Sequence, residues 1–128
     1  MATIDPSFRR RLWVESLTVL AADPSVQVEW LDKYGVPTDE IALDFDHAFL
    51  LTGQLVEEGQ LSRDVLPDLH DIDVVLNEMS GDQNAARWAK GALFSDPGWI
   101  KARQLARRIL IAEFGEWRAP MPDICVIR

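Results

Sequence analysis

The clearest helical periodicity in the chain lies in residues 65–81, which read VLPDLHDIDVVLNEMSG. Apolar side chains recur there at steps of three and four, as one buried side of an α-helix requires. These side chains are Val65, Leu69, Ile72, Leu76 and Met79. Pro67 falls in the first turn, where its missing amide proton costs little, and Ser80-Gly81 can end the helix. The stretch therefore predicts an amphipathic helix with one face in a core.

The segments around this helix carry their own start and stop signals. Aspartate can accept hydrogen bonds from free amides at a helix start, and proline is tolerated at the first helical position. Three Asp-Pro pairs thus predict helices that begin near residues 6, 24 and 97, namely Asp5-Pro6, Asp23-Pro24 and Asp96-Pro97. Gly35 should end the second helix, and Gly115 should end the last one.

Two further helices complete the predicted architecture. One begins at Thr38 and closes at Gly59, and a shorter one runs from about Asn84 to Leu93. Residues 118–128 contain two prolines and should be extended. The predicted fold is all-α, a single compact bundle of about five to six helices with an extended C-terminal tail.

The length of 128 residues fits one domain, residues 1–128, with a core that needs no metal or disulfide. Cys125 is the only cysteine, so it cannot form a disulfide within the chain, and we expect a buried or incidental thiol. We see neither a secretory signal pattern nor the run of ~18 apolar residues that a membrane span needs. We therefore expect a cytoplasmic protein that makes no membrane contact.

The negative charge is concentrated in the middle of the chain. The net charge is −8, but residues 37–82 alone hold 12 acidic residues against one basic residue, Arg63. Residues 83–128 hold four acidic and eight basic residues, several of them in the last predicted helix. An acidic middle segment thus precedes a basic C-terminal third.

The helix of residues 65–81 carries an ordered set of these acids along one flank of its apolar stripe. They are Asp64, Asp68, Asp71, Glu78 and Asp82. Like charges at such spacing repel one another, so something should compensate for them. One interpretation is solvation or pairing with the basic last helix, and the other is a partner protein with a basic surface.

Trp13 is a further candidate for partner binding. It forms a stripe with Leu17 and Leu20 on the first helix, beside a second stripe that contains Phe8 and Leu12. A helix that is apolar on two faces is either central in a bundle or presents one face outward. An outward Trp13 stripe would suit a partner or a homodimer.

Two histidines and two aspartates form a weaker candidate for a divalent metal site. Asp44 precedes His47 by three residues, and Asp73 follows His70 by three. If the third and fourth helices pair, the four side chains could approach one another. However, His70 should point away from the apolar stripe that carries Asp73 on its flank, which argues against the site. We expect no catalytic residues and no cofactor.

These observations favour a non-catalytic domain of the immunity or antitoxin type, which neutralises a basic partner through an acidic helical face. The first alternative is a small metal- or ligand-binding enzyme that uses His47, His70 and nearby carboxylates. The second is a self-associating structural domain. Nucleic-acid binding is disfavoured by the net charge, because the arginines of the last helix can pair with the acidic segment instead.

Overall fold

The helix starts predicted from proline are present in the structure, a computed structural model that describes residues 6–123. Helix α1 spans Pro6–Ala21, α2 spans Pro24–Tyr34 and α6 spans Pro97–Phe114. At α6 the Asp96 carboxylate accepts a hydrogen bond from the amide of Gly98, with 2.8 Å between N and Oδ1. This contact caps the helix as the sequence predicts.

Glycine ends α2 as expected. Gly35 has a φ of 61°, in the left-handed region, and the amide of Val36 donates to the carbonyl of Leu31 at 3.1 Å. This closing pattern lets the chain turn directly into α3, which spans Asp39–Glu57. The turn places the start of α3 beside the end of α2.

Helix α4 spans Leu66–Glu78 and is preceded by the short 3-10 helix η1, Arg63–Val65. The Ser62 hydroxyl accepts a hydrogen bond from the amide of Asp64 at 3.1 Å. The predicted apolar stripe of this segment is buried. The clearest periodicity in the sequence is therefore confirmed in the structure.

The prediction of one helix from Asn84 to Leu93 is wrong. The structure has a 3-10 helix, η2, at Asp82–Trp88 and one α-helical turn, α5, at Ala92–Ser95. Long-range contacts explain the interruption: the Trp88 Nε1 donates to the carbonyl of Met79 at 2.8 Å, and the Arg87 guanidinium pairs with Asp96. These bonds hold η2 across the ends of α4 and α6, so the chain cannot continue as a regular helix.

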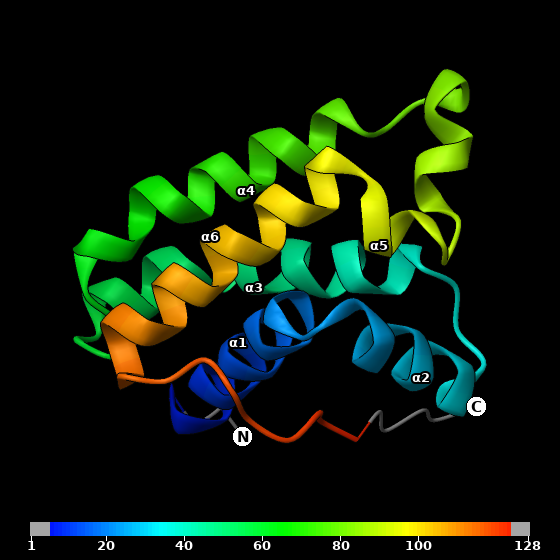
Figure 1. Cartoon of the computed structure of the whole chain (residues 1–128). Coiled ribbons are helices and arrows are strands. Elements are labelled where there is room, and N and C mark those ends of the chain that lie inside the picture. Colours follow the sequence, from blue (N-terminus) through cyan, green and yellow to red (C-terminus); the bar gives the residue numbers. More distant parts are fainter. Residues whose placement is uncertain (1–5, 124–128) are drawn as a thin grey trace, which may run out of the picture.

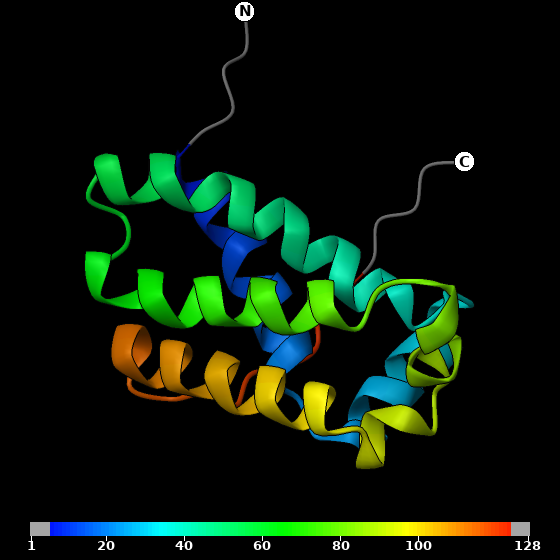
Figure 2. The same cartoon turned by 90° about the horizontal axis from the view of Figure 1, so that it is seen from above.

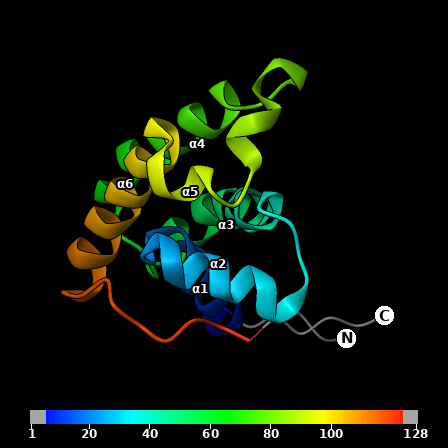
Figure 3. The same cartoon turned by 45° about the vertical axis from the view of Figure 1, so that its right-hand side comes forward.

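The helices pack as a bundle around α1, which contacts both α3 and α6 (Figure 1). Seen from above, α3, α4 and α6 lie side by side in that order and alternate in direction, with α1 crossing beneath them (Figure 2). Residues 115–123 run along α1 and α2 on the side away from α4 (Figure 3). The all-α architecture is as predicted.

The core lies where α1 meets α3 and α6, and its largest fully buried side chains include Trp13, Phe45 and Trp99. Residues 6–123 contain no strand, and no helix among them is long and apolar enough to cross a membrane. Residues 118–123 belong to neither a helix nor a strand. Cys125 and the rest of the predicted tail lie outside the described residues.

Candidate functional site

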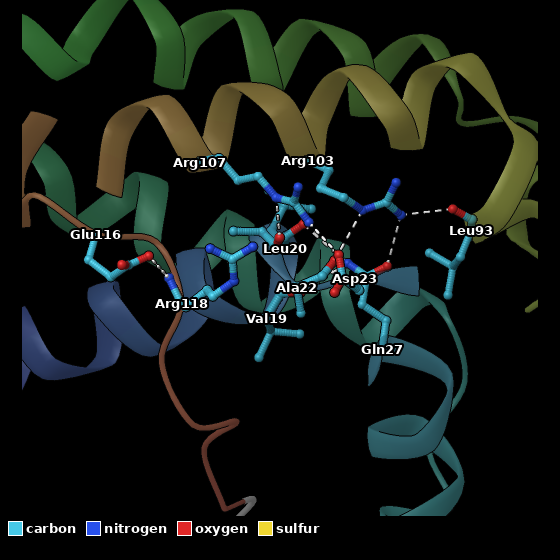
Figure 4. A network of polar contacts seen from close by, with 11 residues as sticks. Val19, Leu20, Ala22, Asp23, Gln27, Leu93, Arg103, Arg107, Glu116 and Arg118 are labelled. Atoms are coloured by element: carbon cyan, nitrogen blue, oxygen red, sulfur yellow. Dashed lines mark hydrogen bonds and ion pairs between the residues drawn. The ribbon is translucent and has the colours of Figure 1, made fainter. Parts of the chain in front are cut away.

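Two arginines of α6, Arg103 and Arg107, bind the C-terminal end of α1 and not the acidic segment (Figure 4). The third, Arg108, pairs with Asp68 of the acidic segment, as expected. Arg103 is buried, with 7% of its surface exposed, and its Nε donates to the carbonyl of Ala22 at 3.0 Å. Its Nη2 donates to the carbonyl of Leu93 at 2.8 Å and to Oε1 of Gln27 at 3.1 Å. The expectation that this arginine pairs with the acidic segment is wrong.

The same end of α1 receives two further side chains. The amide nitrogen of Gln27 donates to the carbonyls of Val19 and Leu20, and the Arg107 Nε donates to the carbonyl of Ala21. The last carbonyls of a helix have no partner within the helix and carry partial negative charge, so cationic donors stabilise them. Arg103 and Arg107 therefore hold α6 against the end of α1.

Burial and the neighbouring Arg107 lower the pKa of Arg103, while Asp23 opposes that shift. Arg107 pairs with Asp23 at 2.9 Å and lies over the ring of Trp117, 3.7 Å from its centroid. These contacts bring α6, the start of α2 and the C-terminal segment together.

Most of the acidic segment is consequently left without basic partners. Two of the 12 acidic residues between 37 and 82 form ion pairs in the described structure: Glu58 with Arg9 at 2.6 Å and Asp68 with Arg108 at 3.1 Å. The other ten have no ion pair within residues 6–123. Residues 37–82 thus carry many carboxylates that form no ion pair within the described residues.

The predicted acidic flank of α4 is only partly available to a partner. Asp64, Asp71, Glu78 and Asp82 are exposed. Asp68 is half-buried and already engaged by Arg108, on the side that packs against α6. Four of the five predicted carboxylates can therefore meet a partner without losing an existing ion pair.

Trp13 is removed from the candidate surface by its burial. Its exposed fraction is 0%, and its Nε1 donates to the hydroxyl of Thr52 at 3.1 Å. Leu17 and Leu20 are buried with it. The Trp13 stripe packs into the core because α1 is central, so it cannot serve as a contact for a homodimer or a partner.

Two exposed leucines on α3 were not singled out by the sequence analysis. Leu50 is 81% exposed and Leu43 is 51% exposed. They alternate with Asp39 and Asp46 at steps of four, three and four, so the four residues share one face of the helix. The sequence carried a signal for their exposure, because both leucines lie off the apolar stripe of α3. That stripe contains Ile41, Phe45, Ala48, Thr52 and Leu55.

On this side of α3, the carboxylate of Asp46 lies near the carboxylate of Asp73 on α4. The pKa of Asp46 is raised, first by burial and then by the nearby Asp73 carboxylate, while His47 opposes the shift. No basic side chain of the described structure lies between α3 and α4 as an ion-pair partner of either aspartate. The exposed carboxylates and leucines that α3, α4 and the adjoining turns carry are together named the acidic–leucine surface, of which Asp39, Leu43, Asp46 and Asp82 line one groove. Its residues are Asp39, Leu43, Asp46, Leu50, Asp64, Asp71, Glu78 and Asp82.

Part of the acidic–leucine surface is hollowed. A groove of about 460 Å³ lies between the start of α3 and the turn that leads into η2. Asp39, Asp46 and Asp82 line it, together with Leu43 and Trp88. Three carboxylates above an apolar floor suit a lysine or arginine side chain, whose stem is apolar and whose head is cationic.

A second hollow lies beside a neighbouring face of α3. This α1–α3 cleft has a volume of about 570 Å³ and is formed by α1, the start of α3, Trp30 and residues 122–123. Within it the pKa of Asp44 is raised to about 6 by burial and by the adjacent Glu40 carboxylate, while His47 opposes the shift. Asp44 therefore carries a charge that its surroundings disfavour at neutral pH.

The raised pKa of Asp44 predicts how stability depends on pH. Because the folded protein holds this proton more tightly than the unfolded chain, Asp44 contributes stability below pH 4 that is lost as the pH rises through about 6. Asp44→Asn cannot titrate. Between pH 4 and pH 7 the unmodified chain should therefore lose stability relative to Asp44→Asn. Urea denaturation measures this as an increase in the free energy of unfolding of the variant minus that of the unmodified chain. A difference that stays constant over this range contradicts the prediction.

The structure does not assemble the four candidate metal ligands. Asp44 lines the α1–α3 cleft, whereas Asp73 faces Asp46 across the gap between α3 and α4. His47 and His70 are both exposed. Within residues 6–123 no group of three or more His, Cys, Asp or Glu side chains is arranged to hold a metal ion.

Comparison with known proteins adds no relative: no protein-family model, no curated protein and no solved structure matches this chain.

Proposed function

We propose that this chain is a non-catalytic binding domain of the immunity or antitoxin type, which neutralises a basic partner protein through the acidic–leucine surface. The supporting observation is the division of charge: the arginines of α6 are largely consumed by internal contacts, and ten carboxylates of the middle segment keep no ion pair within the described residues. A surface built this way repels acidic molecules and attracts basic ones.

The exposed leucines give this surface a second means of binding. Charged groups at an interface mainly speed association and select the partner, whereas buried apolar anchors slow dissociation. Leu43 and Leu50 stand among the acids of α3 and can supply such anchors. The partner should accordingly present lysines or arginines around an apolar patch.

Capture of partners from a lysate of the source organism, at low and at high salt, tests this function. We expect a stoichiometric basic protein that is retained at low salt and weakened at high salt, because exposed charge pairs are screened by ions. Co-expression with the chain should relieve any toxicity of that protein. If no basic protein is retained at either salt concentration, the proposal fails.

Charge reversal on the acidic–leucine surface should slow association with that partner. Asp46→Lys and Asp71→Lys each should reduce the association rate constant by about 3- to 10-fold, because each replaces an attractive charge by a repulsive one. The matched control is Glu29→Lys on α2, which changes the net charge equally at an exposed site elsewhere. Surface plasmon resonance supplies the rates, and equal effects at all three positions would contradict the proposed surface.

A further inference from the structure

The α1–α3 cleft combines an apolar floor with an acidic wall. Phe8 and Leu12 of α1 line it and are 43% and 39% exposed, although large apolar side chains are usually covered. Val19 and Trp30 extend the apolar lining inward. The floor is therefore apolar surface that the described residues leave partly open to water.

Four carboxylates and one arginine line the wall. Arg11 lies 3.6 Å from Glu15, measured from Nε to Oε1. Asp123 accepts a hydrogen bond from the Tyr34 hydroxyl at 2.8 Å. Neither Glu40 nor Asp44 has an ion pair within the described residues.

Glu40 and Asp44 lie one helical turn apart on α3 and repel each other across the cleft wall. A cation placed between them would relieve this repulsion, and the adjacent apolar floor would cover an aliphatic stem. An arginine side chain has both parts, and its planar guanidinium can bond two carboxylates at once. A neutral or acidic group of the same size gains nothing from this wall.

We propose that the α1–α3 cleft binds an arginine side chain of the partner, with the stem on Leu12 and the guanidinium between Glu40 and Asp44. This inference rests on the proposed function, because it assigns the partner's anchoring residue. It also adds a contact on a neighbouring face of α3, beside the face that carries Asp39, Leu43, Asp46 and Leu50. An arginine-bearing segment of the partner would then contact α3 on two adjacent faces.

The test uses the full chain and the probe peptide acetyl-Leu-Arg-Leu-amide, so it does not depend on the partner. Its matched control contains citrulline, which has nearly the shape of arginine and no charge. We expect the arginine peptide to shift the NMR signals of the Trp30 indole, Leu12 and Glu40. We expect the citrulline peptide to bind at least about tenfold more weakly than the arginine peptide.

A variant pair locates the binding. Glu40→Gln combined with Asp44→Asn should weaken the arginine peptide by about tenfold, whereas Asp39→Asn, which lines the other groove, should leave it unchanged. The proposal is overturned by equal binding of the two peptides or by shifts confined to the groove beside Asp39. It is also overturned by no shifts at all, as would follow if the chain filled its own cleft. If the partner is still captured and remains sensitive to Asp46→Lys, only the cleft assignment fails.

Discussion

Replacing Arg103 by methionine is expected to lower the free energy of unfolding by about 3–5 kcal/mol. Methionine is also a long, unbranched side chain and fills much of the same space, so the loss comes mainly from hydrogen bonding. Three buried acceptors lose their donor at once: the carbonyls of Ala22 and Leu93 and the side-chain oxygen of Gln27. A buried acceptor that has no water to replace its partner costs about 1–3 kcal/mol.

Arg108→Met is the matched control for this prediction. Arg108 belongs to the same helix and pairs with Asp68, but its side chain is 70% exposed. Exposed ion pairs contribute about 0–1 kcal/mol, so this variant should be nearly as stable as the unmodified chain. Urea denaturation followed by circular dichroism measures both. Similar small losses for the two variants would mean that Arg103 does not hold the bundle together.

Replacing Trp13 by alanine is expected to cost about 3–5 kcal/mol, comparable to the loss of Arg103. The Trp13 side chain is fully buried where α1 faces α3, and the cavity left behind cannot fill without moving both helices. The Thr52 hydroxyl would also lose the donor that now reaches it at 3.1 Å.

Thr52→Val separates the two contributions, because valine keeps the shape of threonine but cannot accept the indole hydrogen bond. It should cost about 1–2 kcal/mol, clearly less than Trp13→Ala. The midpoint of urea denaturation gives both values. A Trp13→Ala variant as stable as the unmodified chain would contradict the central position of α1.

The helix boundaries could be predicted from the sequence because they depend on local chemistry. The Asp-Pro pairs, Gly35, Gly115 and the apolar stripe of residues 65–81 act within a few neighbouring residues. The segment between Asn84 and Leu93 could not be predicted in the same way. Its interruption depends on bonds from Trp88 and Arg87 to residues of other elements.

The candidate site could be predicted only in part. The excess of carboxylates in residues 37–82 is visible in the sequence, but the destination of the α6 arginines is not. Arg103 and Arg107 bind residues at and just after the end of α1. Three of these bonds join residues that are more than eighty positions apart in the chain. A charge count could not distinguish that arrangement from pairing with α4.

Trp13 and Leu50 show that residue type alone does not determine whether a side chain is buried or exposed. Both are large apolar side chains, and the sequence analysis left two positions open for the tryptophan, one central in the bundle and one on a contact surface. The structure buries Trp13 completely and leaves Leu50 81% exposed. The difference follows from which side of each helix meets the bundle, and for α3 the apolar stripe already indicated that side.

Amide hydrogen exchange of this chain, alone and with the basic partner retained at low salt, tests the acidic–leucine surface most directly. We expect deuterium uptake to fall in peptides from α3 and from residues 80–88, and to stay unchanged in peptides from α2. Protection confined to α2 or to α6, with α3 exchanging as in the free protein, would show that the acidic–leucine surface is not the binding site.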